Sequence, residues 1–128
     1  MTNHKILILD DDKYIRLTLD QFLEQKHYEP TVAGEGKDAL ALLKEQSFDL
    51  FLLDVHLQEM SGMDILCQAM EIQPDLKTIV ISEHPSIEEA VEAMKLGASN
   101  VICKPHDFIQ KPFAPDALFK AIEEALQT

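Results

Sequence analysis

Acidic residues stand at the ends of two strongly apolar stretches of this sequence. Asp10 and Asp11 follow the run KILIL, and Asp54 ends the run FDLFLLD. An ionised carboxylate buried beside such a run costs free energy unless it has a functional partner. These acids are therefore candidates for a functional site. Converging carboxylates repel one another, and a hard divalent cation such as Mg²⁺, which prefers oxygen ligands, relieves that repulsion. The pattern therefore predicts a site for such a cation among these acids.

A hydroxyl and a lysine follow two further apolar runs. Ser82 ends TIVIS, and Lys104 follows NVIC. Carboxylates, a hydroxyl, a lysine and a metal ion together suit phosphoryl transfer, in which an aspartate can be the nucleophile while the other groups neutralise charge on the transferred phosphoryl group. Neither a GxGxxG pattern nor a GK[ST] pattern follows the first apolar run, which disfavours a nucleotide-binding site there.

These side chains need a scaffold that brings the ends of the apolar runs together. Short apolar runs, typical of buried strands, alternate with longer segments whose apolar residues recur at helical spacing. The predicted strands are residues 5–9, 28–33, 48–54, 76–82 and 100–103, and the predicted helices are residues 13–26, 38–46, 62–73, 86–97 and 114–127. This alternation predicts an α/β fold, a single doubly wound domain whose parallel sheet carries helices on both faces. The polar residues would then share the carboxyl edge of the sheet, where such folds bind ligands.

Local signals set some helix boundaries. Asp12 is expected to cap the first helix or to be solvated, and Gly34 and Gly36 are expected to break the chain before the second. Ser86 is expected to cap the helix over 86–97, and Gly97 to close it. An apolar stripe predicts the packing face of that helix: Ile87, Ala90, Val91 and Met94.

Composition narrows the possible partners. The chain has 128 residues, 46% of them hydrophobic, and a formal net charge of -12, which fits one globular domain whose surface repels nucleic acid and anionic lipid. The N-terminal apolar run is too short and too acidic for a signal peptide or a membrane span, so a cytoplasmic location is expected. Cys67 and Cys103 lie in apolar runs and are expected to be buried, reduced thiols.

The ordered segments resemble the receiver domain of two-component response regulators. The matching segments are KILILDDDKYIR, FDLFLLD, TIVIS, EAMKLGA and a final Lys-Pro pair, and the resemblance covers essentially the whole chain, residues 1–128. It implies a (βα)5 domain with a five-stranded sheet of order 2-1-3-4-5. It also implies a signalling function rather than a separate enzymatic one, with Mg²⁺ as the cofactor and with phosphorylation and dephosphorylation at one aspartate.

The resemblance also assigns roles to individual residues. Asp54 resembles the phosphoacceptor, and Asp10 and Asp11 resemble the acidic pair, with Asp11 the direct Mg²⁺ ligand. His56 resembles the position that offers its backbone carbonyl to the metal, and Ser82 resembles the switch hydroxyl. The loop after Asp54 departs from the family at Gln58, Glu59 and Ser61, which lack the usual Pro, Gly and Asp. His84 could gate access to Asp54 or could be an ordinary solvated residue.

A repeat of seven residues leaves two candidates for the lysine that contacts the phosphoryl group. VICKPHD is followed directly by FIQKPFA, so Lys104 and Lys111 each precede a proline. The short path from Gly97 into NVIC favours Lys104, because short connections dominate α/β units. The family's approach to the last helix, including Phe113, favours Lys111. Only one of the two lysines can stand opposite Asp54, and Lys104 is the preferred assignment.

The expected function is a phosphorylation switch. A histidine kinase or phosphotransfer protein would supply the phosphoryl group, and the surface of the last two helices and the last strand would change for an effector or in a phosphorylation-dependent homodimer. One alternative is a receiver-like docking module that works without phosphorylation. An FMN electron carrier is the other, and the absent phosphate loop counts against it.

Overall fold

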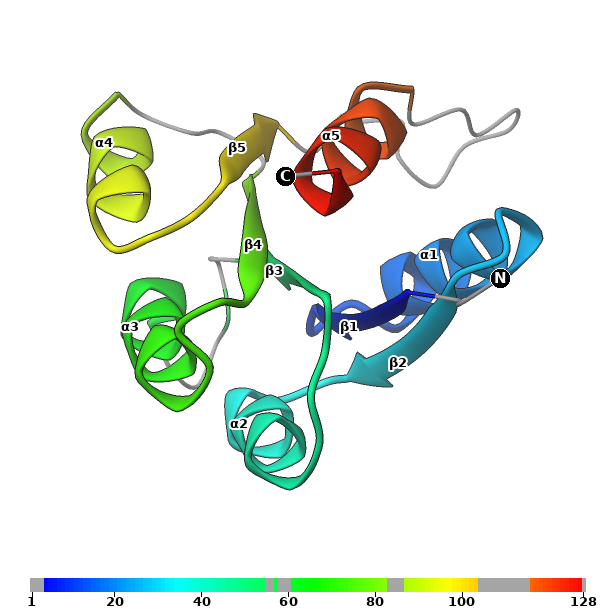
Figure 1. Ribbon diagram of the computed structural model, residues 1–128, viewed down its shortest axis with the longest axis horizontal. Coiled ribbons are helices and arrows are strands. Elements are labelled where there is room, and N and C mark those ends of the chain that lie inside the picture. The colour runs from blue at the N-terminus through cyan, green and yellow to red at the C-terminus, as the bar shows by residue number, and fades with distance from the viewer. Residues whose placement is uncertain (1–3, 55–56, 58–60, 83–86, 104–115, 128) are drawn as a thin grey trace.

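The computed structural model describes residues 4–54, 57, 61–82, 87–103 and 116–127. Strands and helices alternate along them (Figure 1). The strands are β1 (Lys5–Leu9), β2 (Glu29–Ala33), β3 (Leu50–Asp54), β4 (Lys77–Ser82) and β5 (Asn100–Cys103). The helices are α1 (Lys13–Gln25), α2 (Gly36–Glu45), α3 (Gly62–Ile72), α4 (Ile87–Lys95) and α5 (Asp116–Leu126).

The strands form one parallel sheet in the order β2-β1-β3-β4-β5. Successive side chains of β1 point to opposite faces, which produces two separate cores. Ile6 and Ile8 pack with α1 and α5, whereas Leu7 and Leu9 pack with buried residues of α2 and α3. Figure 1 shows α1 and α5 on one side of the sheet and α2, α3 and α4 on the other. The prediction of an α/β fold with a parallel sheet and helices on both faces is confirmed.

A side-chain amide joins several segments at the amino-terminal edge of the sheet. Gln73, which follows α3, donates from Nε2 to the carbonyl oxygens of Leu43 at 2.7 Å and Gln46 at 2.8 Å. Its Oε1 accepts from the amide of Phe48 at 3.3 Å. These bonds satisfy carbonyls at the end of α2 and join two helices to the segment that leads into β3.

Two predictions about helices are wrong. Gly36 does not break the chain, because it is the first residue of α2. Three of the four residues in the stripe on α4 do not face the core: Ile87, Val91 and Met94 are 85%, 46% and 51% exposed, whereas Ala90 is half-buried. The small side chain of Ala93 is the buried contact of α4, so this helix packs through its alanines rather than through the larger apolar side chains that periodicity favours.

The two cysteines have different outcomes. Cys67 is a free thiol, as expected, but it is exposed. It follows Ile65 and Leu66, which are buried on the inner face of α3, and a helix turns the third residue of such a run outward. The side chain of Cys103 lies outside the described part of the structure.

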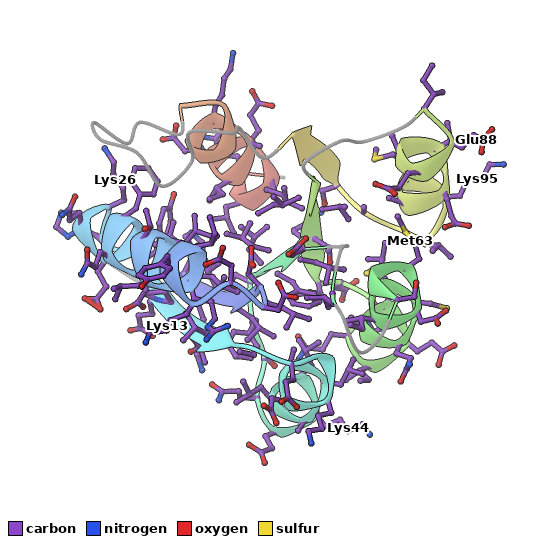
Figure 2. The ribbon with its side chains drawn as sticks, turned by 180° about the vertical axis from the view of Figure 1, so that it is seen from behind. Lys13, Lys26, Lys44, Met63, Glu88 and Lys95 are labelled. Atoms are coloured by element: carbon purple, nitrogen blue, oxygen red, sulfur yellow. The ribbon has the colours of Figure 1, made fainter. Side chains whose placement is uncertain are left out.

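No helix among the described residues is long and apolar enough to span a membrane. Figure 2 shows the labelled lysines Lys44 of α2 and Lys95 of α4 extending outward from their helices. Most of the large apolar side chains of the described residues are buried next to the sheet, and those of α4 are an exception.

Candidate functional site

The acidic site lies at the carboxyl edge of the sheet. Asp10, Asp11 and Asp54 each offer a carboxylate oxygen, and the three oxygens lie within 4.8 Å of one another. Asp10 is 1% exposed and Asp54 3% exposed, whereas Asp11 is exposed. The structure therefore brings together the three acids that the sequence placed at the ends of separate apolar runs.

Strand register explains the convergence. Leu9 of β1 is paired with Leu53 of β3, so the residues that follow them, Asp10 and Asp54, reach the edge at the same level. Asp54 in turn is paired with Ile81 of β4, so the backbone of Ser82 reaches the same edge one residue later. Because β3 lies between β1 and β4, Asp54 stands between the acidic pair and the backbone of Ser82.

Asp12 belongs to the helix rather than to the acidic cluster. Its Oδ1 accepts from the amides of Tyr14 at 2.8 Å and Ile15 at 3.3 Å, which caps α1. Its own amide donates to Oδ1 of Asp10 at 2.9 Å. The expectation that Asp12 caps the first helix is confirmed, and this cap links the start of α1 to the site.

Arg16 is a neighbour of the site that the sequence pattern did not single out. Its Nη1 donates to the backbone carbonyl oxygen of Asp10 at 2.7 Å. The only sequence signal is a basic residue one turn after the capping position, a common arrangement on exposed helices. The contact depends on how α1 lies against the end of β1, which spacing along the chain does not reveal.

The donor set fits a hard divalent cation. Each of the three side chains supplies oxygen, and two of them are almost completely buried, where unrelieved negative charge is most costly. Mg²⁺ binds such oxygen donors and is usually held by one or two carboxylates together with water and phosphate oxygens. The chemistry of the donors therefore agrees with the cation expected from the sequence.

Other predicted site residues fall outside the described part of the chain. They are His56, Gln58, Glu59, His84, Lys104 and Lys111. Ser61 is the residue before α3, and the side chain of Ser82 is not described. The expected roles of His56, Ser82 and Lys104 thus remain predictions, as does the choice between Lys104 and Lys111.

Sequence comparison finds related proteins over nearly the whole chain. The family model described as response regulator receiver domain matches residues 6–123. The alginate biosynthesis transcriptional regulatory protein AlgB of Pseudomonas aeruginosa is 34% identical over 123 residues, which is 96% of this chain and 26% of AlgB. The chain therefore spans about a quarter of the length of the curated relatives it matches.

Comparison with solved structures also finds response regulators. A CheY-like response regulator receiver domain protein from Methanospirillum hungatei superposes with a TM-score of 0.87 and 32% identity, covering 98% of this chain and 95% of the other. A response regulator from Burkholderia pseudomallei, with a phosphorylated aspartic acid, a calcium ion and citrate, has a TM-score of 0.77 and 30% identity. That match covers 98% of this chain and 75% of the other.

Proposed function

Because this chain belongs to the response regulator receiver domain family, we propose that it is a signalling switch in which Asp54 accepts a phosphoryl group. The convergence of the Asp10, Asp11 and Asp54 carboxylates within 4.8 Å at the carboxyl edge of the sheet carries the proposal. Asp54 is the acceptor because it ends the middle strand, between the acidic pair after β1 and Ser82 of β4. In this proposal residues 1–128 form one receiver domain.

The proposed reaction is a displacement at phosphorus. A carboxylate oxygen of Asp54 attacks, the new O–P bond forms, and the bond from phosphorus to the leaving group of the donor breaks, with its electron pair staying on the leaving group. Asp54 becomes an acyl phosphate, and water later hydrolyses it. Because Asp54 is only 3% exposed, fixed groups around it act in a low-dielectric environment where their charges count for more.

Asp10, Asp11 and Asp54 would hold Mg²⁺, with the backbone carbonyl of His56 as a further ligand. When bound, Mg²⁺ would stabilise the negative charge of the transferred phosphoryl group. Asp11 is the proposed direct ligand, because its carboxylate is exposed beside the buried pair. Asp10 is held in place by hydrogen bonds to its neighbours, and the cation would offset the cost of its buried charge.

Lys104 and Ser82 would contact the phosphoryl group. β5 spans Asn100–Cys103 as the fifth strand of a sheet of order 2-1-3-4-5, and Lys104 is the next residue, which supports Lys104 over Lys111. Ser82 pairs with Cys103 across β4 and β5, so the two strands end at the same level. A hydroxyl at Ser82 would then donate to the new phosphoryl oxygen and transmit the change to α4.

A sensor histidine kinase or a phosphotransfer protein would supply the phosphoryl group. The output would pass to an effector domain or protein, as in longer transcriptional regulators of which this chain matches only a quarter. The exposed apolar side chains of α4 support an output surface there, including a phosphorylation-dependent homodimer.

Acetyl phosphate tests the acceptor directly. Incubation with Mg²⁺ should add one phosphoryl group to the intact mass, and Asp54→Asn should abolish the adduct because the amide lacks a nucleophilic oxygen anion. Asp75→Asn, a matched change at an exposed aspartate on the opposite edge, should retain it. Folded parent protein that binds Mg²⁺ and gains no mass would instead favour the docking module.

Separate lysine variants decide which of the two seven-residue repeats supplies the phosphate-contacting lysine. Lys104→Ala should lower the rate of adduct formation by about 10²-fold, since a charged donor to the transferring group is lost. Lys111→Ala should react at nearly the parent rate in the same time course. Equal losses from both variants, or a loss confined to Lys111→Ala, would contradict the assignment of Lys104.

A further inference from the structure

We propose that Arg16, with the space left by Gly34, is a positioning residue that fixes Asp10 for cation binding. The inference rests on the proposed Mg²⁺ site, and it concerns how this chain prepares that site. Arg16 offers no ligand atom itself, because a guanidinium is a donor only. It acts through the backbone of Asp10.

Three of the hydrogen bonds that Asp10 makes restrain its backbone and its side chain. Its amide donates to the carbonyl oxygen of Ala33 at 3.3 Å, and its Oδ1 accepts from the amide of Asp12 at 2.9 Å. Its own carbonyl oxygen accepts from Nη1 of Arg16 at 2.7 Å, the shortest of the three. The Arg16 contact is also the only one of these three supplied by a side chain. It therefore restrains the peptide plane between Asp10 and Asp11, the two residues of the acidic pair.

The guanidinium occupies space that exists because residue 34 is glycine. A Cβ placed on Gly34 would come within 2.9 Å of Nη1 and 3.2 Å of Cζ of Arg16. Gly34 does not have a positive φ, so its backbone does not demand glycine. What the missing side chain provides is room, and an alanine there would push the Arg16 side chain away from the Asp10 carbonyl.

Groups that orient metal ligands affect the affinity for the metal. Such neighbours typically contribute about 10–100-fold to metal binding when their own contacts are lost. Arg16 contributes in this way by binding the backbone carbonyl of Asp10, a buried residue whose carboxylate is one of the proposed ligands. A merely structural contact would lower stability and leave the Mg²⁺ affinity of the folded protein unchanged, which separates the two roles.

The test is calorimetric titration of Mg²⁺ into folded, unphosphorylated variants, with circular dichroism to confirm folding. Arg16→Ala should bind Mg²⁺ about tenfold more weakly, and Gly34→Ala should weaken binding in the same direction. The double variant should bind no more weakly than Arg16→Ala, because the added methyl then has no guanidinium to displace. Arg16→Lys should recover part of the loss, since an ammonium can still donate one hydrogen bond.

Lys13→Ala is the matched control. Lys13 is exposed at the start of the same helix, and its loss removes the same unit of charge near the acidic cluster. Its affinity should stay close to that of the parent. An equal loss in Lys13→Ala and Arg16→Ala would reduce the effect to general charge and overturn the inference.

Two further outcomes are decisive. Parent-like affinity in folded Gly34→Ala and Arg16→Ala would overturn the role of Arg16 while leaving the Mg²⁺ site intact. If Arg16→Ala failed to fold, Gly34→Ala alone would decide, because it retains the arginine. A parent protein that binds no Mg²⁺ would overturn the proposed metal site itself and this inference with it.

Discussion

Three consecutive aspartates at the end of β1 have three different surroundings. Asp10 is buried and bound through its backbone, Asp11 is exposed beside it, and Asp12 caps α1. Their residue type is the same, so position alone separates them: the strand ends, the chain turns, and the helix begins. The cap was predictable because Asp is favoured immediately before a helix, and the convergence with Asp54 was predictable because both follow parallel strands.

Tyr28, the residue before β2, provides a pH-dependent prediction. Burial, and then the nearby Glu123 carboxylate, raise the pKa of Tyr28 above its ordinary value of about 10. The unfolded chain therefore releases this phenol proton first as pH rises, so the free energy of unfolding should fall from pH of about 10 upward through the folded pKa. Phenolate absorbance of Tyr14→Phe, which leaves Tyr28 as the single tyrosine, measures that pKa.

Two variants control this titration. Glu123→Gln should bring the Tyr28 pKa back toward its ordinary value, because it removes the charge that disfavours phenolate. Tyr28→Phe should remove that part of the fall in stability. A Tyr28 pKa at or below the ordinary value would contradict the partial burial of Tyr28 near the Glu123 carboxylate of α5.

At the scale of elements, α1 and α4 end in the same way with different residues. After α4, the amide of Gly97 bonds to the carbonyl of Met94, and that of Ala98 to the carbonyl of Ala93. After α1, His27 and Tyr28 make the equivalent bonds. The left-handed residue is Gly97 in one motif, with φ of 113°, and His27 in the other, with φ of 69°. Glycine adopts this conformation without strain and histidine does not.

Opposite substitutions at these two helix ends should have opposite effects. Gly97→Ala should lower the free energy of unfolding by about 1–2 kcal/mol, because an L side chain is strained there and its Cβ would approach Cε of Met70 to 3.2 Å. His27→Gly should raise it by up to about 1 kcal/mol, since relief of strain exceeds the added flexibility of the unfolded chain. Urea unfolding measures both, and a shift in the same direction would contradict this account.

The face of a helix was harder to predict than its existence. The period of apolar residues identified α4 and its glycine end, yet Ile87, Val91 and Met94 face solvent. Periodicity identifies an apolar stripe but not what covers it, and a helix can pack through a single small residue such as Ala93. Gly36 shows the same limit, because glycine is discouraged inside helices but not excluded from their first position.

At the scale of the whole molecule, the sheet was the part that the sequence predicted best. The contacts that hold the acidic residues in place were the part that it predicted least. Alternating strands and helices determine a parallel sheet, and therefore a shared carboxyl edge. The contact between Arg16 and the space at Gly34 joins a helix to the end of an edge strand, and nothing in the local sequence of either segment indicates it. Such contacts arise only after the elements have packed.

The site should also change the stability of the whole molecule. A ligand that binds only the folded state stabilises it by mass action, so Mg²⁺ at about 100 times its Kd should add about 2.7 kcal/mol to the free energy of unfolding. Thermal unfolding with Mg²⁺, and with NaCl of equal ionic strength, separates binding from screening of the net charge of -12. Asp11→Asn should remove most of the Mg²⁺ effect, and equal shifts from both salts would count against specific binding.

The Gln73 amide cannot be exchanged for a carboxylate of the same shape without loss. Gln73→Glu would set a carboxylate against the carbonyl oxygens of Leu43 and Gln46, where two N–H groups now donate. Two hydrogen bonds would be replaced by repulsion between acceptors, in a partly buried place where neither side is readily solvated. A change of one mass unit at a residue far from Asp54 would thereby weaken the hydrogen bonding that connects α2 and α3 to the segment before β3.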